Sequence, residues 1–146
     1  MKIALGSDHA GYALKEAIKK HLLSLGHEVL DSGTTSEASV DYPDYVIPAA
    51  ECVSKKDADV GIVFGGSGNG EAIAANKVKG ILCGVCWDEW SARLAKEHNN
   101  ANVISLGGRV VSEECGIRIV DVWLSSVFEG GRHQRRLEKI CERTNG

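Results

Sequence analysis

The sequence has little of what marks several classes of protein. Only 2 of its 146 residues are proline and 5% are aromatic, and no low-complexity tract occurs, which argues against a disordered or fibrous chain. No apolar run approaches the roughly 20 residues that a membrane-spanning helix needs, and the first residues read as a strand and not as a signal peptide. The net charge of −3 gives no overall basic field that would attract nucleic acid or an anionic membrane. Any anion site must therefore be local.

Five cysteines are scattered through apolar segments, an odd number that favours reduced thiols and a cytoplasmic location. Cys83 and Cys86 form a C-x-x-C pair inside a strand-like segment. Residues three apart in a strand point to opposite faces of the sheet. We therefore expect core thiols here, and no redox or zinc pair.

Short apolar segments alternate with helical patterns along the whole chain, which is typical of βαβ units and a parallel sheet. The strands are predicted at residues 2–6, 28–31, 60–64, 81–86 and 103–106. Helices are predicted at about 13–25, 45–55 and 88–98, from residue 70 or 71, after an N-cap at Ser112, and at about 132–143. No repeat or linker divides the chain. We expect one α/β domain over residues 1–146, a Rossmann-like, three-layer fold with a five-stranded parallel sheet flanked by helices and a C-terminal helix.

A glycine-rich loop follows the third predicted strand, at the sheet edge where open α/β folds bind their ligands. Gly65-Gly66-Ser67-Gly68-Asn69-Gly70 opens a helix there, so backbone N–H groups and the helix dipole would converge on one point. The spacing fits neither a dinucleotide fingerprint nor a Walker A loop. A tight turn without a ligand is the alternative, but four glycines in six residues favour a close approach of the backbone to a ligand.

Ionisable groups at three other positions could have either a structural or a functional role. Glu71 is either a carboxylate that complements the helix dipole or a base beside the anion hole. Asp8-His9 follows the first strand, where Asp8 could simply cap a helix. His98 ends the fourth helix, where a dipole partner is common. Because that helix returns to the other edge of the sheet, a catalytic His98 would serve the site of a partner subunit.

Arg132 and Arg136 share one face of the last helix and could clamp a phosphate. A solvated basic face is the usual alternative, and nucleic-acid binding fits poorly with an acidic chain that lacks interleaved aromatics. His9, His98 and His133 lie in separate segments, so no group of ligands with metal-binding spacing is expected.

Taken together, the motifs resemble those of the ribose-5-phosphate isomerase B family, which includes the galactose-6-phosphate isomerase subunits. The resemblance covers nearly the whole chain. It rests on Ser7-Asp8-His9-Ala10-Gly11, Val40-Asp41-Tyr42-Pro43-Asp44, Gly65–Gly70 with Ile73-Ala74-Ala75-Asn76-Lys77, His98-Asn99-Asn100-Ala101, Gly107-Gly108-Arg109 and Gly131-Arg132-His133-Gln134-Arg135-Arg136. One departure concerns the loop. Many members have Cys-Gly-Thr-Gly there with the Cys as base, whereas Gly65 and Ser67 occupy the Cys and Thr positions here. The sequence resembles a second branch with a Glu base where Glu71 stands.

The resemblance implies an aldose–ketose isomerase of the pentose phosphate pathway, which interconverts ribose 5-phosphate and ribulose 5-phosphate through a cis-enediolate without metal or cofactor. Glu71 would be the base, and His98 with Asp8 would open the sugar ring. The implied substrate-binding residues are Asp8, His9, Gly66, Ser67, Gly68, Asn69, Gly70, Asn99, Arg109, Arg132 and Arg136, with Asp41 and Tyr42 as weaker candidates for the pocket wall. The active protein would be a homodimer with shared sites, or a dimer of dimers.

Two alternatives stay open. The substrate could be another phosphorylated sugar, such as allose 6-phosphate, galactose 6-phosphate or a tetrose phosphate, because pocket depth cannot be read from sequence. The chain could also be a non-catalytic sugar-phosphate-binding protein, since a fold does not fix a function. Such a protein would need the anion hole and the arginines but no base.

Overall fold

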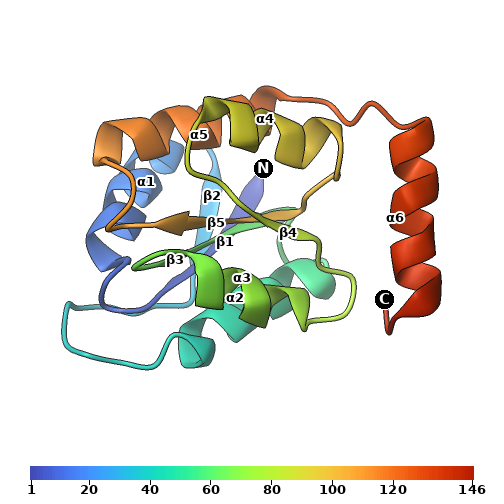
Figure 1. The fold of residues 1–146 in the computed structure, drawn as a ribbon. Coiled ribbons are helices and arrows are strands. Elements are labelled where there is room, and N and C mark those ends of the chain that lie inside the picture. Colours follow the sequence, from blue (N-terminus) through green and yellow to red (C-terminus); the bar gives the residue numbers. More distant parts are fainter.

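The computed structural model describes residues 1–146 and has one five-stranded parallel sheet between two layers of helices (Figure 1). The strands are β1 (Lys2–Ser7), β2 (Glu28–Asp31), β3 (Val60–Gly65), β4 (Cys83–Val85) and β5 (Val103–Gly107), in the spatial order β2-β1-β3-β5-β4. The helices are α1 (Tyr12–Ser24), α2 (Pro43–Ser54), α3 (Asn69–Asn76), α4 (Glu89–Glu97), α5 (Glu113–Ser125) and α6 (Arg132–Arg143). The predicted α/β fold and its five-stranded parallel sheet are confirmed.

The two sheet faces are covered by different helices because alternate strand residues point to opposite sides. Ile3 and Leu5 of β1 join the core under α1, α4 and α5, whereas Ala4 joins the core under α2 and α3. Strands β1, β3 and β5 are buried almost throughout. Their residues are apolar on both faces, which is why they form the centre of a parallel sheet.

The boundaries differ from the predicted ones mainly at the sheet edge. Strand β4 covers only Cys83–Val85 and not residues 81–86, because it pairs with β5 alone and the N–H of Leu82 donates to the side chain of Asn102 at 2.9 Å. Helix α3 begins at Asn69, slightly earlier than predicted. The predicted cap at Ser112 is confirmed, since its hydroxyl accepts the N–H of Cys115. No helix is both long and apolar enough to cross a membrane.

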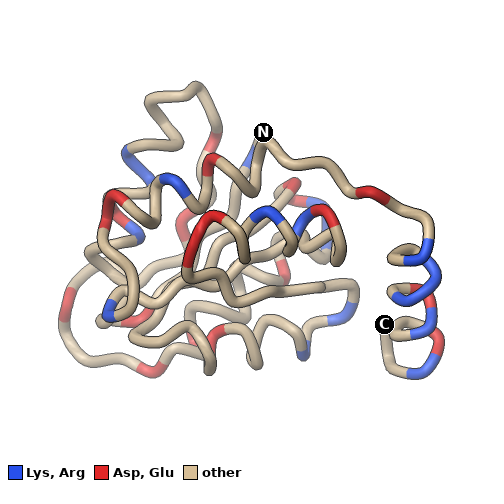
Figure 2. The backbone as a smooth tube through the Cα atoms, turned by 45° about the horizontal axis from the view of Figure 1, so that its top comes forward, with Lys and Arg blue, Asp and Glu red and all other residues tan.

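Helix α6 lies to one side of the other elements, at the end of a segment that leads away from α5 (Figure 1). Its bounds are those predicted, and His133 and Leu137 are its only buried residues. Lys and Arg recur along it (Figure 2). A 12-residue helix is only marginally stable without tertiary packing. Most of the surface of α6 has no such packing in the single chain.

Candidate functional site

Three loops meet at the carboxyl edge of the sheet, as expected for an open α/β fold. The segment Gly107–Arg109 lies on the glycine-rich loop: Gly108 N–H donates to Gly65 O at 2.7 Å and Arg109 N–H to Gly66 O at 3.0 Å. The segment after β1 joins them, since Asp8 N–H donates to Phe64 O at 3.3 Å. The predicted site residues of these loops are therefore neighbours in space.

The glycine-rich loop presents free donors at the start of α3. Gly68 takes a φ of 89°, which favours glycine, and its carbonyl accepts the buried hydroxyl of Ser105 at 2.7 Å. The N–H groups of Gly66, Ser67 and Gly70 donate no hydrogen bond within the chain. Three unpaired donors at a helix N-terminus form a site for an oxyanion or a phosphate oxygen.

Glu71 places its carboxylate beside this loop, in the first turn of α3. The residue is only 4% exposed. Burial raises its pKa, and the charge of Asp8 adds to this, whereas the N–H groups of Glu71 and Gly68 act in the opposite direction. The result is a carboxylate that binds a proton more tightly than usual, a useful property for a base.

Gly65 gives a steric reason why the loop holds no cysteine base. A Cβ atom at this position would overlap with the carboxylate group of Glu71. A side chain at position 65 and the carboxylate of Glu71 thus compete for the same space. The chain can place either group there, and it places the carboxylate.

Asp8 and His9 lie on the other side of the loop. Asp8 is 7% exposed, and its carboxylate accepts the N–H groups of Ala10 at 2.9 Å and Gly11 at 3.1 Å. It does not cap α1, whose N-cap is Gly11. The Nδ1 atom of His9 accepts the N–H of Val40 at 3.2 Å. In its neutral form, His9 therefore carries its hydrogen on Nε2, as a donor for an anion.

The loop is lined by two further side chains. A Cβ on Gly66 would lie 3.3 Å from Nη1 of Arg109, and a Cβ on Gly70 would lie 2.6 Å from Cζ of Tyr42. Arg109 thus adds a positive charge beside the free N–H groups, and the ring of Tyr42 lies against Gly70. Asp41 is exposed.

A groove of about 610 Å³ adjoins the loop along α3 and the edge strand β4. Its lining is Asn69, Ala72, Ile73, Asn76, Lys77, Cys83 and Val85. Ile73 is 62% exposed and adds apolar surface to the groove. The groove and Glu71 share helix α3, although Glu71 is not part of the groove lining.

His98 and Asn99 lie at the opposite edge of the sheet. His98 is the C-cap of α4, and the chain then leads to the amino end of β5. Asn102 O accepts the N–H of Gly61 at 2.9 Å, which fixes this segment beside the start of β3. Glu71, in contrast, follows the carboxyl end of β3. One subunit therefore cannot bring both residues to one small substrate.

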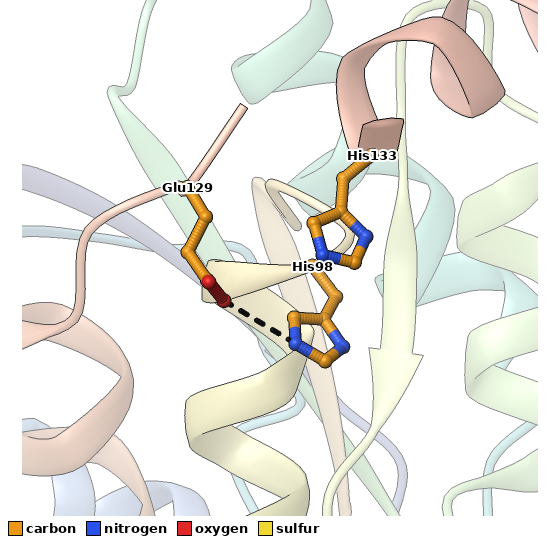
Figure 3. A group of neighbouring side chains, drawn as sticks. All are labelled: His98, Glu129 and His133. Atoms are coloured by element: carbon orange, nitrogen blue, oxygen red, sulfur yellow. Dashed lines mark ion pairs between the residues drawn. The ribbon is translucent and has the colours of Figure 1, made fainter. Parts of the chain in front are cut away.

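The structure brings His98 and His133 together. No group of neighbouring ligand residues was expected from the sequence, because the two histidines are far apart in it. Their rings stack at 4.2 Å between centroids, and Glu129 Oε1 lies 3.3 Å from Nε2 of His98 (Figure 3). The expectation that separate segments exclude such a group is wrong for His98 and His133, because Gly130 and Gly131, both at positive φ, turn the chain so that α6 starts beside the end of α4. The same turn puts the exposed Arg132 and Arg136 on the His98 side of the molecule. Glu129 was missed, since a single acidic residue in a loop gives no signal in the sequence.

The C-x-x-C pair has the arrangement expected of core thiols. Cys86 belongs to the core under α1, α4 and α5, and Cys83 packs on the core of the other sheet face. Burial raises the pKa of each thiol to about 12. Neither sulfur is a reactive thiolate near neutral pH.

Comparisons with known proteins agree on one family. The family model described as Ribose/Galactose Isomerase matches residues 3–140. Ribose-5-phosphate isomerase B of Escherichia coli (strain K12) is 48% identical over 139 residues, which cover 95% of this chain and 93% of that protein. The structure of ribose-5-phosphate isomerase B from Clostridium thermocellum is similar with a TM-score of 0.96 at 50% identity, covering 97% of this chain and 96% of that one. The enzyme from Mycoplasma genitalium, solved with bound ribulose-5-phosphate, has a TM-score of 0.92 at 43% identity, covering 98% and 97%.

Proposed function

The chain belongs to the ribose/galactose isomerase family, and on this basis we propose that it interconverts D-ribose 5-phosphate and D-ribulose 5-phosphate through a cis-enediolate. The observation that carries the proposal is a buried, unusually basic carboxylate, Glu71, beside the three unpaired N–H groups of Gly66, Ser67 and Gly70. An aldose–ketose isomerase needs these two things, a base for a carbon-bound proton and donors for the oxyanion that forms.

Glu71 is the proposed proton shuttle in this reaction. In the open-chain aldose it removes the proton from C2, and the electron pair forms the C1–C2 double bond while the C1 oxygen becomes an oxyanion. The free N–H groups of the loop stabilise that charge. A proton then passes between the two neighbouring oxygens, and Glu71 returns its proton to C1, which leaves a carbonyl at C2. We propose no metal or cofactor, because the loop amides and arginines can supply the electrostatic stabilisation.

The phosphate has proposed ligands from both edges of the sheet. His9 and Arg109 lie beside the glycine-rich loop. Arg132 and Arg136 lie one turn apart on α6, and Asn99 follows His98. Guanidinium groups four residues apart on a helix can grip one phosphate together.

A second copy of the chain is the proposed source of the missing half of each site. Glu71 lies at one edge of the sheet and His98 at the other, so one substrate can meet both only across an interface. The packing of α6 supports this: most of its surface is exposed on the chain alone, and the groove along α3 offers an apolar surface next to Glu71. A two-fold dimer would give two equivalent sites, and a dimer of dimers would keep them.

Turnover of a panel of phosphorylated aldoses tests the proposed function. We expect ketose to form from ribose 5-phosphate with a higher kcat/KM than from allose 6-phosphate, galactose 6-phosphate or erythrose 4-phosphate. Glu71→Gln protein purified in the same way controls for a contaminating isomerase. No ketose from any of these sugars, together with binding of the phosphate esters, would instead identify a sugar-phosphate-binding protein.

If His98 opens the sugar ring, its loss should slow the reaction of a cyclic substrate much more than that of an acyclic one. Ribose 5-phosphate is mostly a furanose, whereas ribulose 5-phosphate cannot close a furanose ring because its C5 oxygen carries the phosphate. His98→Asn should slow the conversion of ribose 5-phosphate by about 10²-fold or more, the usual worth of a positioned acid. Exchange of the C1 hydrogen of ribulose 5-phosphate with D₂O, followed by NMR, should change far less. An equal loss of both activities would assign His98 to another role.

A further inference from the structure

Glu129 and His133 hold the side chain of His98 on two sides. Its side chain is 34% exposed, and its Nε2 faces Glu129 Oε1 at 3.3 Å. The ring of His133 stacks on one face, 14° from parallel (Figure 3). His133 itself is only 7% exposed. An imidazole at the frayed end of a helix would otherwise sample several rotamers.

A backbone hydrogen bond fixes the segment that carries Glu129 to the helix that carries His98. Glu129 N–H donates to the carbonyl of Glu97, the last residue of α4, at 3.0 Å. His133 N–H donates to Gly130 O at 3.1 Å as α6 begins. The segment between α5 and α6 is thus bonded to the end of α4 at Glu129, the residue whose side chain faces His98.

The arrangement suits the control of a proton better than the binding of a metal ion. The ligand atoms of His98, Glu129 and His133 lie within 4.8 Å of one another. Two imidazoles that bind one cation point their in-plane lone pairs at it. The stacked, nearly parallel rings here instead point their lone pairs side by side.

We propose that Glu129 and His133 are positioning residues that fix the orientation and tautomer of His98 for ring opening. The proposal rests on the function proposed above for His98. The carboxylate of Glu129, 3.3 Å from Nε2, favours a hydrogen on that nitrogen, which leaves Nδ1, on the other side of the ring (Figure 3), to face the sugar. His133 prevents the ring from turning away.

The chemistry of ring opening matches this geometry. As a base removes the proton from the C1 hydroxyl, C1 becomes a carbonyl, the bond from C1 to the ring oxygen breaks, and that oxygen takes the proton from Nδ1 of His98. The neutral imidazole that remains carries its hydrogen on Nε2, the nitrogen that faces the Glu129 carboxylate. A carboxylate that holds a histidine in the tautomer needed for proton transfer is a known device of enzymes.

His133 suits its place as an uncharged neighbour. Desolvation lowers its pKa, and the charges of His98, Arg132 and Arg136 lower it further, against an opposite effect of Glu129. A lowered pKa favours the uncharged form of the His133 ring.

Substitutions of Glu129 test the proposal in the full-length protein. Glu129→Ala should lower kcat for ribose 5-phosphate about 10- to 100-fold, the order expected when a reacting group is misplaced, with little change in KM. Glu129→Gln should recover most of this loss because its amide oxygen can face the same nitrogen of His98. Neither variant should affect the exchange of the C1 hydrogen of ribulose 5-phosphate. Glu138→Ala removes a carboxylate that bonds only to Gln134 on α6 and should behave like the wild type.

His133 allows an independent test of the stack. His133→Phe keeps an aromatic ring on His98 and should retain most of kcat, whereas His133→Ala should lose kcat as Glu129→Ala does. An unchanged kcat in Glu129→Ala, an equal loss in the Gln variant, or a parallel loss of C1 hydrogen exchange would overturn the positioning role. A wild-type protein that does not convert ribose 5-phosphate would instead refute the proposed function itself.

Discussion

Replacement of Glu71 by Gln should lower kcat for ribose 5-phosphate by about 10²–10⁴ while KM changes little, because a positioned base contributes about this much to the rate. The amide fills the same space but cannot take the C2 proton. The phosphate ligands and the loop N–H groups remain, so the substrate still binds. Exchange of the C1 hydrogen of ribulose 5-phosphate should fall with kcat, since both depend on the same base. Steady-state kinetics and NMR measure the two effects.

The loss should not come from unfolding. The pKa of Glu71 is raised in the folded protein, so between its ordinary and its raised value the folded state binds more protons than the unfolded state. Stability then falls as pH rises through this window. Gln carries no such charge, and the variant should be at least as stable as the wild type at pH 7–8. Glu113 is an exposed carboxylate in the first turn of α5, so Glu113→Gln is a matched control. Near-normal kcat in Glu71→Gln would move the base elsewhere.

Much of the fold could be predicted from the sequence because its signals are local. The period of apolar residues predicts the strands and most of the helices, and Ser112 marks the start of α5 through a cap that involves only its own turn. The predicted strand at residues 81–86 came out shorter because a strand at the sheet edge has one partner and not two. Hydrogen bonding to a distant Asn102 side chain is not visible in a sequence pattern.

Part of the site could likewise be predicted from local sequence, and part could not. The glycine-rich loop, Asp8 and Glu71 could be predicted because each lies in a segment that follows the carboxyl end of a strand, and all parallel strands end at one edge. The contact of His98 with Glu129 and His133 could not, because it depends on the path of the chain through Gly130 and Gly131. The overlap of a Cβ at position 65 with the Glu71 carboxylate is also a fact of packing. This overlap gives a steric reason why glycine, and not cysteine, stands at position 65.

A site shared between subunits predicts that two inactive variants restore each other. In a hybrid of a Glu71→Gln chain and a His98→Asn chain, one site combines the intact Glu71 of one chain with the intact His98 of the other. The second site has both defects. Random pairing of equal amounts gives about half hybrids with one active site in each, so about a quarter of wild-type activity should return.

The reverse mixture is the matched control. Wild-type chains mixed with equal amounts of the Glu71→Gln/His98→Asn double variant form hybrids in which every shared site has one defect. Activity should then fall to about a quarter of that of the same total amount of wild-type chains, from the remaining wild-type dimers alone. Sites built within one chain would leave about a half.

Activity recovered by mixing the two single variants is the most direct test of the central claim, that Glu71 of one subunit and His98 of another act on one sugar phosphate. Chains are exchanged by mild denaturation and refolding, and native mass spectrometry measures the fraction of hybrids. The shared site predicts activity that rises in proportion to this fraction, towards about a quarter of wild type at random pairing. Hybrids that form in that amount and stay inactive would contradict it.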